Sequence, residues 1–156
     1  MQAKISNFDL SHKFNVISQP IDNIDDRINW SAPEELKCIS KNSILQEDFI
    51  YTTQCEIFSL GMLLWELDFQ RKPYEEMTMM EILKHVSNGG RETLDTESCS
   101  NSIQKGYYSI IKLAWDQAPS LRPVVQHIFN MLQKLYDKHI VQDINFIDNV
   151  FRESLV

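Results

Sequence analysis

The chain has 156 residues, 43% of them apolar, and a formal net charge of −7. This length and composition suit one compact domain with its own core, and the acidic balance argues against nucleic acid or an anionic membrane as a direct partner. Three cysteines without C-x-x-C spacing indicate neither a zinc site nor a disulfide framework, so a reducing, cytoplasmic location is expected. The longest apolar stretch, residues 57–67, is too short for a membrane span.

The N-terminal part predicts a short strand followed by a long loop. Lys4-Ile5-Ser6 is typical of the end of a strand that runs into a turn at Asn7-Phe8-Asp9. Residues 11–29 are polar, and Pro20 together with the cluster from Asp22 to Asp26 interrupts any periodicity. We therefore expect a surface loop there.

The remainder predicts helices. Between Thr52 and Leu67 apolar residues cover nearly the whole circumference of a helix, as in a buried central helix. A second helix is expected from Glu75 to Asn88, where Gly89-Gly90 ends it. The segment from Arg91 to Ser102 has the polarity of a loop.

Two further helices are expected near the C-terminus, from Tyr107 to Trp115 and from Pro123 to Tyr136, with Pro123 at the favoured first position. Beyond them, one apolar stripe recurs at helical spacing through Ile140, Ile144, Ile147, Phe151 and Leu155. Residues 138–156 are therefore predicted to be an amphipathic helical tail. It either packs on its own domain or docks a partner or a second copy.

Three separated motifs occur in one order: Lys4-Ile5-Ser6-Asn7-Phe8-Asp9-Leu10, Trp30-Ser31-Ala32-Pro33-Glu34, and the run from Trp115 to Pro123. Together they resemble the second half of a protein kinase domain of the tyrosine-kinase-like type, over residues 1–137. The resemblance implies a mainly α fold: a kinase C-lobe helical bundle with a short N-terminal strand and an activation-segment loop.

In kinases the first motif reads Asp-Phe-Gly, and its aspartate holds the magnesium ions that bridge the ATP phosphates. This chain has Asn7-Phe8-Asp9. An amide oxygen is a neutral ligand, so metal binding at Asn7 is expected to be weakened. Asp9 replaces a glycine and reaches unusual backbone angles less freely. Without the resemblance, a side-chain-bonded turn is the simpler interpretation.

Ala32-Pro33-Glu34 resembles the tripeptide that closes the kinase activation segment. The resemblance implies that Glu34 pairs with Arg122 in a buried, structural ion pair, because a guanidinium meets a carboxylate bidentately. It also implies that Trp115 and Trp65 are core anchors.

Glu56 occupies a position where the family has an aspartate that supports the catalytic loop by accepting backbone hydrogen bonds. Glutamate is one methylene longer, which puts that role in doubt. The alternative is that Glu56 complements the dipole at the start of its helix.

Other parts of the kinase pattern have no counterpart in the sequence. The four glycines form no G-x-G-x-x-G loop, and neither a Val-Ala-Ile-Lys strand nor a His-Arg-Asp loop is present. No catalytic residue and no metal site are therefore predicted for this chain. ATP and magnesium are implied only for a longer parent protein.

Two functions follow from the resemblance. The chain is either part of a tyrosine-kinase-like domain that transfers phosphate from ATP to protein hydroxyls, and is itself inactive, or it is a complete, non-catalytic pseudokinase-like interaction module. In both cases we expect a protein partner or the upstream lobe to cover the surface around Phe8 and Leu10. Self-association is the other expected outcome.

Overall fold

The computed structural model describes residues 17–18, 27–40, 49–95 and 101–153, and the described residues are mainly helical. In chain order the elements are β1 (Ile17–Ser18), η3 (Ile28–Trp30), α1 (Pro33–Ser40), β2 (Phe49–Ile50), α2 (Thr53–Phe69), α3 (Met79–Ser87), α4 (Ser102–Ala114), η4 (Pro119–Leu121) and α5 (Val125–Glu153). The mainly α class implied by the motifs is confirmed. The two strands form one short antiparallel pair, in which Ile17 is opposite Ile50.

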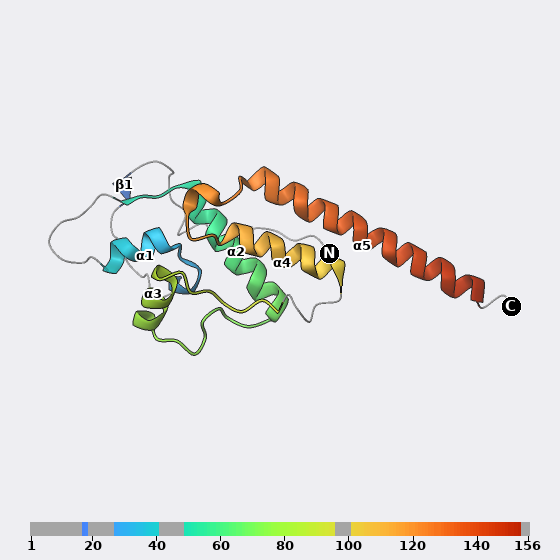
Figure 1. The fold of residues 1–156 in the computed structure, drawn as a ribbon, viewed down its shortest axis with the longest axis horizontal. Coiled ribbons are helices and arrows are strands. Elements are labelled where there is room, and N and C mark those ends of the chain that lie inside the picture. The colour runs from blue at the N-terminus through green and yellow to red at the C-terminus, as the bar shows by residue number, and fades with distance from the viewer. Residues whose placement is uncertain (1–16, 19–26, 41–48, 96–100, 154–156) are drawn as a thin grey trace.

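Helix α2 lies at the centre of the fold. It packs against α4 on one side and against η3 on another, while α1 packs on α3 (Figure 1). Phe58 and Trp65 of α2 are fully buried, and Trp115 at the end of α4 is almost so. The prediction that Trp65 and Trp115 anchor the core is confirmed.

The helix boundaries differ from the predicted ones where a capping residue decides them. Helix α3 begins at Met79 because Thr78 and Glu81 form a capping box, in which Glu81 Oε2 accepts from the Thr78 backbone N–H at 2.8 Å. Helix α4 begins at Ser102, five residues before the expected Tyr107. Asn101 caps it by accepting from the Ile103 N–H at 2.8 Å.

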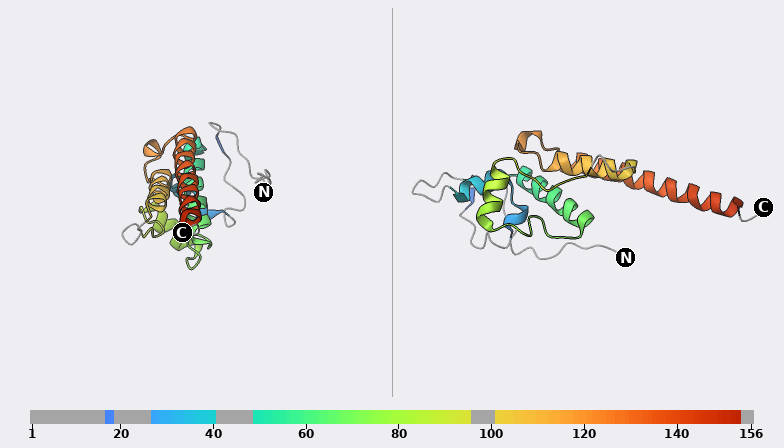
Figure 2. Two further views of the ribbon diagram at one scale, coloured as in Figure 1. Left: turned by 90° about the vertical axis from the view of Figure 1, so that its right-hand side faces the viewer. Right: turned by 60° about the horizontal axis from the view of Figure 1, so that its bottom comes forward.

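The last helix is one continuous element, where a helix and a separate tail were expected. Helix α5 starts at Val125 and runs through the predicted end at Tyr136 without a break. The Lys138 ammonium donates to Ser102 Oγ at 2.8 Å, so α5 passes the first residue of α4 at that point. Beyond it, α5 extends past the other described elements (Figures 1 and 2).

Helix α1 was not predicted, because its eight residues carry few apolar side chains in a regular pattern. The predicted strand at 4–6 and most of the predicted loop at 11–29 lie outside the described residues. In the part of the chain that the structure describes, no helix combines the length and apolar character needed to cross a bilayer.

Candidate functional site

The best-defined site joins the start of α1 to the segment before α5. Arg122 Nη1 and Nη2 donate to Glu34 Oε1 and Oε2 at 2.6 and 2.8 Å, a bidentate ion pair between residues 88 positions apart. The pairing that the resemblance implied is therefore present. The Arg122 side chain is fully buried, whereas that of Glu34 is 24% exposed, so the expectation that both residues are buried was wrong for Glu34. Glu34 lies in the first turn of α1, where one side meets solvent.

Arg122 also satisfies two backbone carbonyls. Its Nε donates to the Asp116 carbonyl at 2.8 Å, and Nη1 donates to the Gln54 carbonyl at 2.8 Å. One guanidinium thus joins α1, the first turn of α2 and the loop after α4. A lysine has no planar fork and would not replace these contacts.

Phe58 lies close to two guanidinium groups. The Cζ atoms of Arg122 and Arg91 are 5.1 and 4.8 Å from the centroid of the Phe58 ring, within the range of a cation–π contact. Arg91 Nε donates to the Trp115 carbonyl at 2.9 Å, and its Nη2 donates to Gln117 Oε1 at 2.7 Å. The loop after α3 is therefore linked through Phe58 to the Glu34–Arg122 pair.

The residues just before α1 are fastened to α2 and to the loop after it. Trp30 Nε1–H donates to Glu66 Oε2 at 2.7 Å, and the Ser59 hydroxyl donates to the Trp30 carbonyl at 2.9 Å. Asn29 is buried and its Nδ2 donates to the Pro73 carbonyl at 2.6 Å. Lys72 lies over the Trp30 ring at 5.6 Å.

Glu35 is a buried carboxylate beside this segment, with 3% of its surface exposed. Its Oε2 accepts from the Ala32 N–H at 3.0 Å, and its Oε1 is 3.7 Å from Arg27 Nη2. Burial raises the pKa of Glu35 above its ordinary value, although the Ala32 hydrogen bond and Arg27 oppose this shift.

Glu56 is exposed, as expected of a residue that complements a helix dipole, and lies in the first turn of α2. Its Oε1 accepts from the Tyr51 hydroxyl at 2.8 Å. Nearby, the Cys55 thiol donates to Glu34 Oε1 at 3.4 Å, and burial raises its pKa to about 12.

The other motif residues divide into two groups. Ala32 and Pro33 are buried at the start of α1. Asn7, Phe8 and Asp9 lie outside the described residues, so their geometry stays a prediction. In the ranges that the structure describes, no three His, Cys, Asp or Glu side chains are grouped in a way that would hold a metal ion.

The contacts of Trp30, Arg91 and Glu35 were missed by the sequence analysis. Those of Trp30 and Arg91 join residues from separate elements, and no spacing along the chain indicates them. For Glu35 one signal was available: a glutamate three residues after Ala32 is placed to bond the N–H at a helix start.

Comparison with known proteins places these features in a family. Residues 1–132 match the model of the family described as protein tyrosine and serine/threonine kinase. The chain is 32% identical to the guinea pig (Cavia porcellus) insulin receptor-related protein over 108 residues, which are 69% of this chain and 7% of that protein.

Two further relatives give the same result. The chain is 30% identical to the insulin-like peptide receptor of Branchiostoma lanceolatum over 132 residues, which are 82% of this chain and 8% of that protein. It is also 30% identical to the mouse proto-oncogene tyrosine-protein kinase ROS over 107 residues, which are 68% of this chain and 4% of that protein. The chain thus spans less than a tenth of the length of each of these relatives. With the family model covering most of its length, the chain belongs to the protein tyrosine and serine/threonine kinase family.

Proposed function

We propose that this chain supplies the helical C-lobe scaffold of a tyrosine-kinase-like domain and has no phosphoryl-transfer activity of its own. The observation that carries the proposal is the bidentate pair between Glu34 and Arg122. It fixes the end of the activation-segment region on the helical core, which is what a kinase scaffold must do for the substrate-binding side of the domain.

The sequence supports the absence of activity in the isolated chain. It contains no glycine-rich loop, no ATP-binding lysine and no catalytic loop, and a neutral amide at Asn7 stands where the family has a metal-binding carboxylate. In a longer protein that carried a nucleotide-binding half, Asn7 would still weaken magnesium binding. The transfer of phosphate to protein hydroxyls is a proposal for such a parent. A cytoplasmic location, where ATP is available, belongs to the same proposal.

Thermal denaturation with millimolar ATP and magnesium tests the isolated chain. Because a ligand that binds the native state must raise the melting temperature, we expect no change for the 156-residue chain or for Asn7→Asp. A magnesium-dependent rise in the wild-type chain would refute the proposal. A rise in Asn7→Asp alone would show that residue 7 is what prevents metal binding.

A second candidate function, a non-catalytic interaction module, is favoured by one observation. Leu63 and Leu67 of the central helix are 44% and 55% exposed, although α2 is apolar around its circumference. A central helix with an open apolar side accepts a further protein element. Either an upstream segment of a longer chain or a separate partner protein would cover this apolar side. A pull-down with the upstream lobe of a related kinase distinguishes these two occupants.

A further inference from the structure

Helix α5 carries two apolar faces. One of them includes Ile128 and Leu135 and packs on the core beside α4. The other, which we call the α5 stripe, recurs at helical spacing and consists of Phe129, Tyr136, Ile140, Ile144, Ile147 and Phe151. Its first three residues are exposed, so the described part of the domain does not cover the stripe there.

The second half of α5 leaves the domain. Its contact with Ser102 through Lys138 marks where α4 begins, and residues 139–153, which we call the extension, continue past the other described elements (Figures 1 and 2). The extension also lies beyond residues 1–132, which match the family model. Helices of about 12–15 residues are marginal in water unless an apolar face is packed. The extension therefore requires a partner along the α5 stripe.

We propose that this partner is the α5 stripe of a second copy of the chain, with the two helices antiparallel and centred near Ile140. The part of α5 beside the domain, residues 125–138, and the extension are nearly equal in length, about 20 Å each at 1.5 Å per residue. The extension of each copy then lies along the exposed stripe of the other copy, and the pair closes as a two-fold dimer. Position 129 is level with position 151, and position 136 with position 144.

The paired stripes supply the area that a stable dimer needs. Phe129 and Tyr136 are 57% and 59% exposed. An aromatic side chain can bury about 150–250 Å², so each of these has on the order of 100 Å² left to cover. Six stripe positions from each copy amount to roughly 1,200 Å², the lower end of the range for specific interfaces. Pairing over half of the stripe would fall well below that range, so the two helices must overlap along their whole length.

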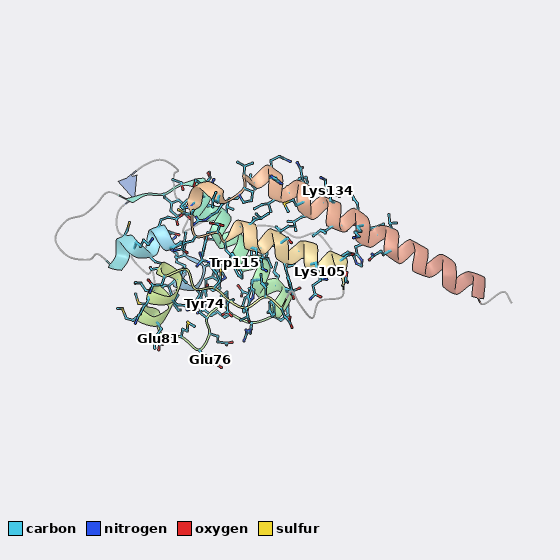
Figure 3. The ribbon with its side chains drawn as sticks, viewed as in Figure 1. Tyr74, Glu76, Glu81, Lys105, Trp115 and Lys134 are labelled. Atoms are coloured by element: carbon cyan, nitrogen blue, oxygen red, sulfur yellow. The ribbon has the colours of Figure 1, made fainter. Side chains whose placement is uncertain are left out.

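The charges of the two halves of α5 favour the antiparallel direction. Residues 125–138 and the adjacent α4 are net positive, and Lys134 and Lys105 are exposed on these neighbouring helices (Figure 3). The extension is net negative, with three acidic residues against Arg152. Packed helices lie about 8–10 Å apart, which is close to the screening length at physiological salt. An antiparallel pair brings the unlike halves together, whereas a parallel pair brings like halves together.

Sedimentation velocity of the full chain measures the pairing. The chain carries Leu63→Lys and Leu67→Glu, so that the exposed side of α2 does not contribute. We expect a species of twice 18.3 kDa that dissociates on dilution. Ile140→Lys should raise the dimer dissociation constant at least about tenfold, because it places two ammonium groups at the centre of the apolar contact.

Val141→Lys is the matched control. Val141 is the next residue of α5 and is also exposed, but it lies about 100° around the helix from Ile140 and off the stripe. It should leave the dissociation constant unchanged, and neither variant should alter the melting temperature. A monomer at every concentration would mean that the extension packs on its own chain or binds a different protein, and would overturn the proposal. Equal dissociation constants for the two variants would also overturn it.

Single cysteines test the direction of the helices, in a background with Cys38→Ser and Cys99→Ser. Ile140→Cys should form a disulfide between copies on mild oxidation. Phe129→Cys should not, because the two copies of position 129 lie about 33 Å apart along an antiparallel pair. A disulfide through Phe129→Cys would indicate a parallel pair and contradict the proposal. None of these results bears on the proposed lack of activity, which nucleotide binding tests.

Discussion

Gly61 of α2 and Ala114 of α4 are in direct contact where the two helices cross. A methyl group added at Gly61 would lie 2.9 Å from Ala114 Cβ and 3.1 Å from the Trp115 backbone nitrogen. Neither atom belongs to a flexible side chain. The close approach of these helices, which carry Phe58 and Trp115, therefore depends on the absence of a side chain at residue 61.

Gly61→Ala should destabilise the domain by about 1–3 kcal/mol, because overpacking forces the helices apart. Alanine is the better helix former by about 1 kcal/mol, so a neutral result would mean that the helices separate at little cost. Urea unfolding followed by circular dichroism measures the change in the free energy of unfolding.

Gly106→Ala is the matched control for that variant. A methyl group there would lie 2.5 Å from Leu135 Cδ2, which is the far end of a flexible side chain. Leu135 can move, so we expect this second glycine substitution to cost less than Gly61→Ala. Equal losses for the two variants would contradict the rigid-contact argument.

Removing Arg122 should be more damaging than removing Glu34. Arg122→Ala loses the ion pair and also leaves the Gln54 and Asp116 carbonyls without this donor. We expect about 3–5 kcal/mol for Arg122→Ala, less for Glu34→Ala because Glu34 is partly exposed, and about 0.5–3 kcal/mol of coupling between them.

A double-mutant cycle in urea provides the measurement. Arg122→Lys adds a control that keeps the charge but loses the bidentate geometry, and it should recover only a small part of the loss. Strict additivity of Glu34→Ala and Arg122→Ala would show that the pair contributes no energy as a unit.

Glu35 should make the domain less stable as the pH rises. Burial raises its folded-state pKa above the ordinary value of 4.5, so the folded state binds the proton more tightly than the unfolded state does. The contribution is fully present below that ordinary value and is lost as the pH rises through the folded pKa. The Glu35→Gln variant keeps the shape of the side chain, but its amide does not titrate.

The measurement compares the free energy of unfolding of the wild-type chain and Glu35→Gln from pH 4 to pH 8. The difference between them should shift in favour of Glu35→Gln as the pH increases. A difference that is constant across this range, or that changes in the opposite direction, would mean that Arg27 and the Ala32 hydrogen bond outweigh burial.

The Cys55 thiol should resist alkylation because its pKa is raised to about 12, mainly by burial, and the thiolate is the reactive form. Cys38 is more exposed, so in a Cys99→Ser background iodoacetamide at pH 8 should label Cys38 first. Peptide mass mapping gives the ratio of labelling at Cys38 to labelling at Cys55. Labelling of both cysteines at equal rates in the native protein would show that α2 opens readily at its first turn.

The sequence predicted what local patterns and motifs determine. The apolar circumference of residues 52–67 indicated the central helix α2, and the resemblance to the kinase family indicated the contact between Glu34 and Arg122. The starts of α3 and α4 were misplaced although Thr78 and Asn101 carried capping information. Contacts such as Trp30 with Glu66 were beyond sequence reasoning, because they depend on how η3 lies across α2.

The exposed side of α2 should make the isolated chain associate. Leu63 and Leu67 lie on the same helix, just over one turn apart, and are 44% and 55% exposed. Burying them against another molecule removes apolar surface from water at about 25 cal/mol per Å². We therefore expect size-exclusion chromatography with light scattering to give a mass above 18.3 kDa that increases with concentration.

Leu63→Lys combined with Leu67→Glu should shift the protein toward monomer with little loss of stability, since neither side chain is in the core. Leu113→Lys, at a 42% exposed position on α4, is the control for a general gain in solubility. A wild-type monomer at every concentration would mean that the chain itself covers this face, and the interaction-module candidate would lose its supporting observation.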